Sequence, residues 1–317
     1  TFKPTGGVLV QITEIIKNID SYDFENIIFY TTTDNLYFFN NIDNKKINIK
    51  CVNFSSKSII FRVIWGQMIL PILLVLNCVD VLFCPGNISP IFCSKKKIQW
   101  IHTIGPFEKN FVSYFAFRER LILIVTKYLI ISSCFTSDMV IFESNYTKDL
   151  FIRKFKQKIQ KSAVIQSGNN VFFKPVKNNS QLLDELEFED FIFTVSHLYP
   201  YKNIELLIES FYALRLYEKG FGILVAGSIS DKKYYEKLKL LVDKYGISKY
   251  VIFLGRLEMK ELRVLYSKCK IFVFTSPFEN FAYTLIEAMS CSSPIITTNT
   301  TAMPESCGDA ALYFSPN

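Results

Sequence analysis

Short apolar runs alternate with stretches of helical periodicity along nearly the whole chain. The apolar runs are rich in Ile, Val and Phe and too short for helices, so they predict β-strands. Helical stretches such as 203–217 and 233–245 fit between most of them. This alternation is typical of parallel sheets with helices on both faces. The predicted strands are 27–30, 47–52, 79–84, 98–101, 139–142, 163–165, 191–195, 222–226, 251–254, 271–274 and 294–297.

The length and one polar interruption predict two domains. The chain has 317 residues, more than the roughly 100 to 150 of a typical single domain. A polar segment of low periodicity begins at Gln166 and is typical of a linker. We therefore predict an α/β protein with two doubly wound, Rossmann-like lobes that face a central cleft. The N-terminal lobe is expected at 1–168, the linker at 169–180 and the C-terminal lobe at 181–317.

The glycine pair near the start of the chain predicts a further strand. A Gly-Gly turn such as Gly6-Gly7 normally follows a strand and lets the backbone approach a phosphate closely. We therefore expect that a first strand precedes Thr1. A plain tight turn is the alternative for these two residues.

Charge and cysteine content narrow the function classes. The net charge of +7 is modest for this length, and the lysines are spread along helical stretches. This balance suits an anionic small molecule or an anionic membrane surface, and no nucleic-acid partner is expected. The eight cysteines form no Cys-x-x-Cys pair and lie mostly in apolar runs. We expect reduced, buried thiols in a cytoplasmic protein, without disulfides or a bound metal.

Two segments invite a membrane interpretation. The most apolar stretch is 59–84, whose longest uncharged run, 63–79, has 17 residues and contains Gln67 and Pro71. A spanning helix needs about 20 apolar residues, so a buried helix followed by a strand is predicted instead. The segment 111–120 mixes aromatic residues and cations as an interfacial patch would. The packed surface of a helix is its alternative.

The segment after the apolar run 271–275 carries the most informative chemistry. Glu279 and Glu287 bracket the run Glu-Asn-Phe-Ala-Tyr-Thr-Leu-Ile-Glu at the start of a predicted helix, 281–290. A carboxylate accepts hydrogen bonds from sugar hydroxyls, and the N-terminus of a helix offers N–H groups to phosphate oxygens. One short segment therefore suits both halves of a nucleotide sugar.

Polar residues also follow the other predicted strands. Open parallel sheets bind ligands outside the carboxyl ends of their strands, which places the expected chemistry in the cleft between the lobes. The positions concerned are Gly6-Gly7, Pro85-Gly86-Asn87, His102, 197–202, Gly227-Ser228, Gly255-Arg256 and 276–279.

The stretch 191–316 resembles the donor-binding half of retaining glycosyltransferases of family 4, which have the GT-B fold. The matching segments are Val195-Ser-His-Leu-Tyr-Pro-Tyr-Lys-Asn, Val225-Ala-Gly, Phe253-Leu-Gly, Phe274-Thr-Ser-Pro-Phe-Glu and Glu287-Ala-Met-Ser-Cys-Ser-Ser-Pro-Ile-Ile. The first half is more weakly similar, through Gly6-Gly7, Leu82-Phe-Cys-Pro-Gly-Asn, Trp100-Ile-His and Ser137-Asp-Met-Val-Ile-Phe-Glu-Ser.

The resemblance implies catalytic roles for three residues. Glu279 would accept hydrogen bonds from the donor sugar, and Lys202 would neutralise the leaving diphosphate together with a helix N-terminus. His102 would contact the donor sugar near the reacting carbon. The ordinary structural alternatives are an acid in the first turn of a helix, a surface lysine and a core histidine, respectively.

The resemblance also implies a donor-binding set. Glu287 would hold the nucleotide ribose, and its alternative is a solvated helix face. The family usually places an arginine five residues before Lys202, where this chain has His197, so Arg256 is a candidate for the second cation. Asn280 and Ala282 stand where the family often has Gly and should narrow the sugar pocket. The set is Gly6, Gly7, His197, Lys202, Gly227, Arg256, Glu279, Asn280, Phe281, Ala282 and Glu287.

The activity implied is transfer of a hexose from a nucleotide diphosphate sugar to an acceptor hydroxyl, with the anomeric configuration retained. The acceptor would be a glycan or a lipid-linked molecule, in cell-surface polysaccharide or glycolipid synthesis. The chain has no Asp-x-Asp pair, the pattern by which the other large glycosyltransferase fold holds a metal, so a metal-independent enzyme without a cofactor is expected. A cytoplasmic localisation is expected, and peripheral association with the inner face of the membrane is an alternative.

Two other functions remain open. A nucleotide-sugar epimerase or a phosphorylase would share the two-lobed architecture. A partner subunit without catalytic activity would keep the fold and bind the donor weakly. Family members also continue for a few helices beyond the position of Asn317, so further C-terminal helices are expected.

Overall fold

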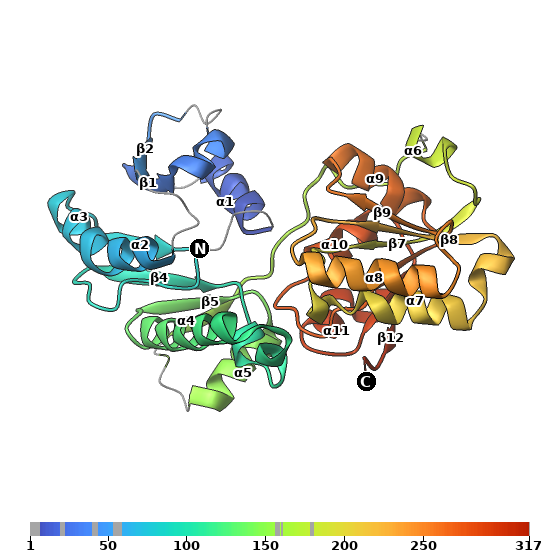
Figure 1. Cartoon of the computed structure of the whole chain (residues 1–317). Helices are drawn as coiled ribbons and strands as arrows, with labels where there is room; N and C mark the ends of the chain where they lie inside the picture. The colour runs from blue at the N-terminus through green and yellow to red at the C-terminus, as the bar shows by residue number, and fades with distance from the viewer. Residues whose placement is uncertain are drawn as a thin grey trace. The chain divides into compact units, whose positions relative to one another are not determined.

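The computed structural model describes residues 7–19, 23–39, 44–52, 59–155, 159, 161–177 and 181–316. The chain divides into two compact units that interleave along the sequence (Figure 1). Unit 1 comprises 1–103, 124–143 and 148–165, and unit 2 comprises 104–123, 144–147 and 166–317. The sequence suggested a single boundary near residue 168, whereas two short segments of the first half belong to unit 2.

Unit 2 is built on one sheet of six parallel strands. The spatial order is β12-β11-β10-β7-β8-β9. The strands are β7 (Asp190–Val195), β8 (Phe221–Ala226), β9 (Val251–Gly255), β10 (Ile271–Phe274), β11 (Ile295–Thr298) and β12 (Ala311–Phe314). The helices are α6 (Gln181–Asp184), α7 (Ile204–Ala213), α8 (Lys232–Lys244), α9 (Met259–Lys268), α10 (Tyr283–Ser290) and α11 (Met303–Cys307).

Helices cover both faces of this sheet because its strands are apolar on both sides. Along β7, Phe191 and Phe193 pack in a cluster with α9 and α10, whereas Ile192 packs in a second cluster with α7 and α8. Successive side chains of a strand point to opposite faces. A continuous apolar run therefore buries a strand on both sides, as the sequence predicted.

Unit 1 contains two smaller parallel sheets, β1-β2 and β3-β4-β5-β6. Their strands are β1 (Ile27–Thr32), β2 (Ile47–Val52), β3 (Val81–Cys84), β4 (Lys96–Ile101), β5 (Met139–Phe142) and β6 (Ser162–Val164). The helices are α1 (Gly7–Lys17), α2 (Ile59–Ile64), α3 (Leu70–Leu76), α4 (Phe117–Phe135) and α5 (Asn145–Phe155). A π-helical turn, η3 (Trp65–Ile69), joins α2 to α3. The α4 helix continues from unit 2 into unit 1.

The α/β parallel-sheet class predicted from the sequence is confirmed, and each predicted strand occurs, with its ends either unchanged or shifted by one or two residues. The short strand β12 was missed. The predicted helix 203–217 was too long, because α7 ends at Ala213 and Arg215 adopts a left-handed backbone conformation with φ 51°. A side chain at positive φ is strained in a helix, so the chain turns there.

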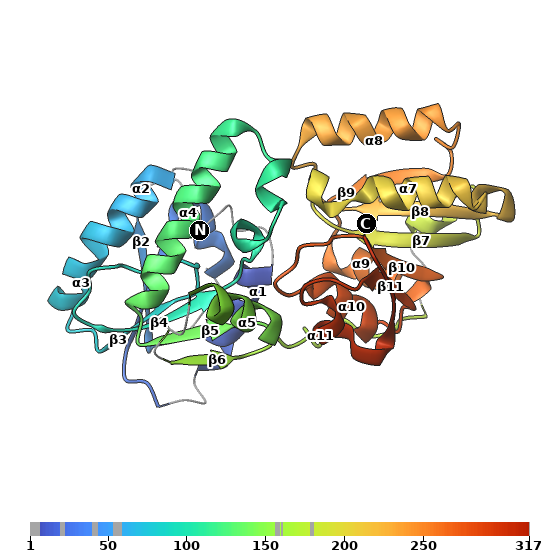
Figure 2. The same ribbon diagram turned by 90° about the horizontal axis from the view of Figure 1, so that it is seen from below.

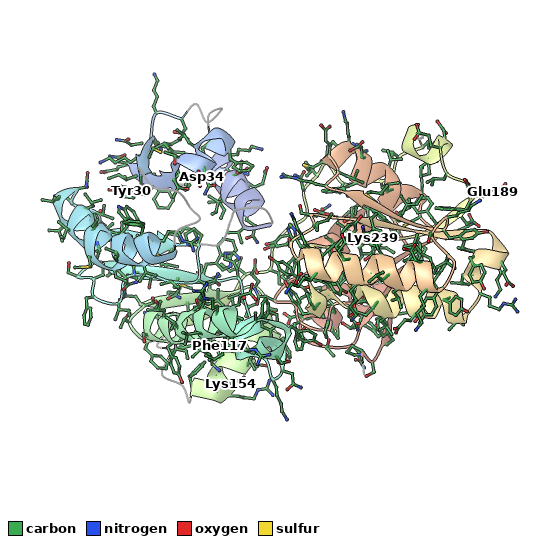
Figure 3. All side chains as sticks on the ribbon, viewed as in Figure 1. Tyr30, Asp34, Phe117, Lys154, Glu189 and Lys239 are labelled. Atoms are coloured by element: carbon green, nitrogen blue, oxygen red, sulfur yellow. The ribbon has the colours of Figure 1, made fainter. Side chains whose placement is uncertain are left out.

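The structure bears on both segments, 59–84 and 111–120, for which the sequence suggested a membrane contact. Within the described ranges, no helix combines the length and apolar character needed to cross a bilayer. The helix at 59–76 was predicted to be buried, and this is wrong, because most of the large apolar side chains described at 61–76 are exposed. In the segment 111–120, Phe111 is buried against Tyr201 and Phe278. That contact favours the packed alternative, although Phe117 is exposed (Figure 3).

Gly222 on β8 has no room for a side chain. A Cβ atom there would lie 2.2 Å from the ring of Phe188, which is itself buried. We expect Gly222→Ala to lower the free energy of unfolding by about 1 to 3 kcal/mol, because the buried ring must move. Urea unfolding measures the change. The matched control is Gly168→Ala, where nothing lies within 4 Å of the new atom. Equal effects of the two substitutions would contradict this packing.

Candidate active site

The carboxyl ends of four neighbouring strands of unit 2 carry the residues singled out in the sequence. His197 follows β7, Gly227 follows β8, Arg256 follows β9, and Glu279 lies in the loop after β10. The strands are parallel and adjacent, so these residues share one edge of the sheet. The spacing of strands in the sequence therefore predicted their common edge correctly.

Lys202 and Glu279 form an ion pair at this edge, between Lys202 Nζ and Glu279 Oε1. The lysine ends the short helix η6 (Pro200–Lys202), and the glutamate lies in the loop before α10. Their side chains are 12% and 17% exposed, so both charges are largely withdrawn from water. The Thr275 hydroxyl donates to the Lys202 carbonyl over 2.7 Å and ties the two loops together.

The environment of Lys202 keeps its ammonium charged. Burial acts to lower the pKa of Lys202, but the Glu279 carboxylate and Tyr201 outweigh it, so the pKa is raised. The ammonium also lies 5.1 Å from the ring centre of Tyr201 and 5.6 Å from that of Phe274. Aromatic faces attract a cation electrostatically. The result is a fixed positive charge in a poorly hydrated place, where it acts strongly on an anion.

The segment between Glu279 and α10 is packed tightly. Asn280, Phe281 and Ala282 are 5%, 7% and 4% exposed. The Thr147 hydroxyl donates to Asn280 Oδ1, and the hydroxyls of Ser167 and Tyr283 are 2.6 Å apart. Side-chain bonds therefore hold the chain in place just before the N-terminus of α10. Glu279 lies outside α10, so it is not an acid in the first turn of that helix.

Glu287 lies within α10 and contacts the core of unit 2. Its Oε2 accepts a hydrogen bond of 2.9 Å from the hydroxyl of Tyr266, a residue of α9 that is fully buried. Burial raises the pKa of Glu287 to about 7, although the Tyr266 hydrogen bond acts in the opposite direction. The alternative of a solvated helix face is wrong for this residue. Sequence analysis missed Tyr266, because a tyrosine in an amphipathic helix carries no local sign of its partner.

Position 227 requires a glycine because two backbone segments lie close together there. Its φ is +135°, and a Cβ atom there would lie 1.8 Å from the Ser196 carbonyl oxygen. Its N–H donates to the Gly255 carbonyl over 2.7 Å. Any side chain would therefore separate the loops after β7 and β8. Gly227 shapes this edge through its backbone.

The second cation expected near Lys202 stays a prediction. His197 is half-buried, and its carbonyl accepts the Tyr199 N–H over 2.9 Å. Arg256 is exposed, and no ion pair of its guanidinium occurs within the described ranges. Either side chain carries donors for a phosphate.

His102 belongs to a buried polar cluster in unit 1. It follows β4, and its Nδ1 lies 3.1 Å from Oε1 of Glu143, which follows β5. The two side chains are 5% and 2% exposed. Gln11 of α1 donates to the same carboxylate oxygen over 2.8 Å. Trp100 packs against the imidazole, with ring centres 4.5 Å apart.

The backbone at His102 is fixed by a second contact. Asn87, in the loop after β3, accepts the N–H groups of His102 and Thr103 through its Oδ1, over 2.6 and 3.1 Å. Sequence analysis quoted Glu143 within a longer segment without singling it out, and it missed Gln11. Their positions at a strand end and in the first helix were the available signals. Gly7 is the first residue of α1, and Gly6 lies outside the described residues.

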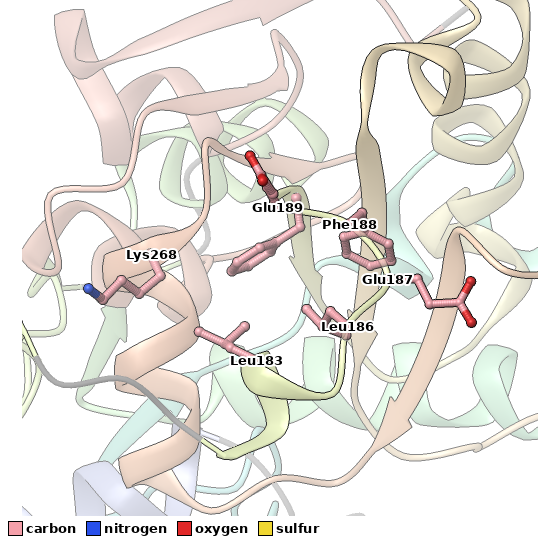
Figure 4. Close-up of a pocket in the computed structure, with 7 residues that line it drawn as sticks. Leu183, Leu186, Glu187, Phe188, Glu189 and Lys268 are labelled. Carbon is pink, nitrogen blue, oxygen red and sulfur yellow. The ribbon is translucent and has the colours of Figure 1, made fainter.

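One pocket of unit 2 lies away from this chemistry. It has a volume of about 410 Å³ and is lined by Leu183, Leu186, Glu187, Phe188, Glu189, Phe191 and Lys268 (Figure 4). These residues gather at the amino end of β7, whereas Lys202 and Glu279 lie beyond the carboxyl ends of the strands. The pocket contains none of the predicted site residues.

Comparison with known proteins identifies the C-terminal part of the chain. Residues 176–317 match the family described as Glycosyl transferases group 1. The chain is 32% identical over 131 residues to the serotype-specific mannosyltransferase WbdA of Escherichia coli, a match over 41% of this chain and 16% of that protein. It is 26% identical over 219 residues to the O-antigen chain mannosyltransferase RfbU of Salmonella typhimurium, over 68% of this chain and 56% of that protein. The chain thus spans only part of these relatives.

The fold is that of solved structures, among them a glycosyltransferase from Rickettsia africae with a TM-score of 0.70 and 18% identity, a match over 98% of this chain and 80% of that one. The crystal structure of Anabaena Alr3699/HepE in complex with UDP and glucose superposes with a TM-score of 0.71. The sequences are 17% identical, and the match covers 100% of this chain and 84% of that one. The GT-B fold expected from the sequence is confirmed.

The raised pKa of Glu287 makes stability depend on pH in a defined direction. Between pH 4.5 and about 7 the folded protein holds a proton on Glu287 that the unfolded chain loses. Stability therefore falls as pH rises through this window. Glu287→Gln keeps an acceptor for Tyr266 and removes the charge. We expect the variant to be more stable than the parent above about pH 7, with the difference shrinking towards pH 4.5, as urea unfolding at a series of pH values will measure.

The matched control for this comparison is Glu209→Gln, at an exposed position of α7. A difference between the Glu287 variant and its parent that stays constant with pH would show that the carboxyl does not titrate in this window.

Proposed function

We propose that the chain moves a hexose from a nucleotide diphosphate sugar to an acceptor hydroxyl, with retention. Residues 176–317 match the group 1 glycosyl transferases, which supports this proposal. One observation carries this proposal. A largely buried ammonium, Lys202, and a largely buried carboxylate, Glu279, meet at the carboxyl edge of a parallel sheet, next to the segment that leads into α10. A diphosphate and a sugar need these two kinds of group side by side.

Lys202 is proposed to stabilise the leaving diphosphate. An ammonium has three donors, so it can bond to a phosphate oxygen while it keeps its contact with Glu279. The N-terminus of α10 adds unpaired N–H groups and a partial positive charge. Fixed donors aimed at developing negative charge usually lower the reaction barrier more than any other single effect. The proposal therefore assigns charge neutralisation to protein groups and includes no metal.

The two glutamates are proposed to hold different parts of the donor. Glu279 accepts hydrogen bonds from sugar hydroxyls. Glu287 holds the ribose, and its hydrogen bond with Tyr266 fixes the direction of its carboxylate. Asn280 and Ala282 add side-chain atoms next to Glu279, which limits the space for the sugar. His197 and Arg256 are the candidates for a second phosphate contact.

His102 is proposed to contact the donor sugar near its reacting carbon. Glu143 would then act as a positioning residue, because its carboxylate lies beside the imidazole, and Gln11 would hold that carboxylate in place. In the proposed step, the bond between the anomeric carbon and the phosphate oxygen breaks as the acceptor oxygen bonds to that carbon. The acceptor proton passes to the departing phosphate oxygen on the same face, which gives retention.

The relatives suggest the substrate class. WbdA and RfbU are named as mannosyltransferases, and HepE was solved with UDP and glucose. A hexose donor and a polysaccharide or lipid-linked acceptor are therefore proposed, in a cytoplasmic setting. Incubation of the protein with nucleotide sugars separates the candidate functions. Transfer supports the proposal, interconversion of the free donor sugar supports an epimerase, phosphorolysis of a glycan supports a phosphorylase, and binding without turnover supports a partner subunit.

Replacement of the buried lysine tests the proposed mechanism. We expect Lys202→Ala to lower kcat by about 100-fold to 1000-fold, the usual cost of losing one well-aimed donor. The donor that raises thermal stability most should be used in a transfer assay. Lys237→Ala is the matched control, since Lys237 also pairs with a glutamate, Glu205, but is 65% exposed. A loss below about threefold for Lys202→Ala would remove this residue from the mechanism.

Glu143→Gln tests the positioning role in unit 1. The substitution keeps the side-chain volume and removes the charge opposite His102 Nδ1. We expect kcat to fall about 10-fold to 100-fold, because a misplaced group costs that much, while the dissociation constant of the donor changes little. Transfer kinetics and donor binding should be measured on the same preparation. A stability loss without a change in kcat would show that Glu143 only supports the core.

A further inference from the structure

Glu305 of α11 holds two segments that lie far from it in the sequence. Its Oε1 accepts hydrogen bonds from the backbone N–H of Asn145 over 2.7 Å, from the Asn145 side chain over 2.8 Å and from the Gln166 side chain over 3.0 Å. Its Oε2 accepts the N–H of Tyr146 over 3.0 Å. All four residues belong to unit 2. One carboxylate therefore joins α11 to the segment 144–147 and to Gln166.

The first turn of α5 has its N–H groups satisfied in this way. A helix leaves the N–H groups of its first turn without partners inside the helix. Glu305 accepts those of Asn145 and Tyr146, and the Ser144 hydroxyl accepts that of Thr147 over 3.2 Å. The partial positive charge at the N-terminus of a helix also attracts a carboxylate. The start of α5 is therefore fixed by a side chain of α11.

The first of the two segments, 144–147, contacts residues 280–283, which lead into α10 and are called the donor segment below. The Ser144 hydroxyl donates to Thr147 Oγ1 over 2.9 Å, and the Thr147 hydroxyl donates to Asn280 Oδ1. Ser144 and Thr147 are 0% exposed, and Asn280 is 5% exposed. Hydrogen bonds in such a chain strengthen one another at low local dielectric. The position of Asn280 therefore depends on the first turn of α5.

The second segment, Gln166 and Ser167, contacts the other end of the donor segment. Gln166 donates to Glu305 Oε1, and the hydroxyls of Ser167 and Tyr283 are 2.6 Å apart. Tyr283 is the first residue of α10. The helix that carries Glu305, α11, packs with α10 in one apolar cluster (Figure 2). Glu305 thus acts on the donor segment through two separate hydrogen-bonded connections.

An ordinary helix cap does not account for this arrangement. A side chain that caps a helix normally comes from the residue just before its first turn, as Ser144 does here. Glu305 comes from 160 positions further along the chain than Asn145, and it also binds Gln166, which is outside α5. Both segments that it holds then bond to the donor segment. The common result of these contacts is a fixed donor segment.

We propose that Glu305 is a positioning residue, which fixes the donor segment in the place where it contacts the sugar of a nucleotide diphosphate sugar. This inference rests on the proposed function, in which Asn280 and Ala282 limit the space for that sugar. They limit it only while their segment is held in one place. The nucleotide depends less on Glu305, because Glu287 lies further along α10 and is held by Tyr266.

Hydrogen exchange tests the structural part of the proposal without any substrate. Glu305→Gln removes the charge and places an NH2 group where the carboxylate accepts only N–H donors. We expect amide exchange in 144–147 and in the donor segment to become at least about threefold faster, because local opening costs less free energy. The matched control is Glu119→Gln, since Glu119 also accepts a backbone N–H at the start of a helix, that of Ala116 over 3.0 Å. Unchanged exchange in the donor segment of Glu305→Gln would overturn the proposal.

Calorimetry with UDP-glucose and UMP tests the connection to the sugar. We expect Glu305→Gln to weaken binding of UDP-glucose about threefold to tenfold, the usual worth of one hydrogen bond. Binding of UMP, which lacks the sugar and the second phosphate, should weaken by less than about twofold. Thr147→Val should have the same selective effect. The double variant should lose less than the product of the two single losses, because both residues act through one contact.

Two results of the binding experiment would contradict the positioning role. Equal losses for UDP-glucose and UMP, or single losses that multiply in the double variant, would show that Glu305 only supports the fold. If Glu305→Gln does not fold by circular dichroism, Thr147→Val and Ser167→Ala provide the same comparison. A parent protein that binds neither molecule contradicts the proposed function, and the exchange measurement then still decides whether Glu305 fixes the donor segment.

Discussion

The buried ion pair between Lys202 and Glu279 depends on a constraint of the parallel sheet. The two residues are 77 positions apart and come from loops after two adjacent parallel strands, β7 and β10. In a parallel sheet all strands end at the same edge, so loops far apart in the sequence meet there. Each charge is largely removed from water, and neither would be stable at that depth without the other. The site therefore exists only because the sheet is formed.

Glu287 in α10 lowers the stability of the folded protein at neutral pH. Glu287 is held against the core with Tyr266 as its hydrogen-bond donor, and burial raises the pKa of Glu287 to about 7. The folded protein would be more stable above neutral pH with an apolar residue in place of Glu287. A carboxyl group that costs stability in a well-packed unit is better explained by binding than by folding. The His102 and Glu143 pair in unit 1 is also buried, with side chains that are 5% and 2% exposed.

Unit 1 has a helix with exposed apolar side chains and inward-facing polar ones. Its helix at 59–76 leaves seven large apolar side chains exposed, while Gln67 and Asn77 make hydrogen bonds within the unit. The sequence predicted burial for this helix because hydrophobic residues normally face a core. Composition alone does not tell which of two apolar faces packs, since both sides of the helix are apolar. Only the contacts of Gln67 and Trp65 decide which side faces outward.

The sequence by itself determined the alternation of strands and helices, the parallel sheets and the segments after the strands that carry Lys202, Glu279 and Glu287. These features follow from local periodicity and from the rule that ligands bind beyond the carboxyl ends of strands. The tertiary structure alone decided which side chains contact one another. The partners Tyr266 of Glu287 and Glu143 of His102 come from distant elements, and no local pattern encodes such a contact. Burial depends on how whole elements pack, because desolvation is a property of the folded surroundings. The pKa of Glu287 and the exposure of the apolar side chains at 61–76 therefore depend on the tertiary structure.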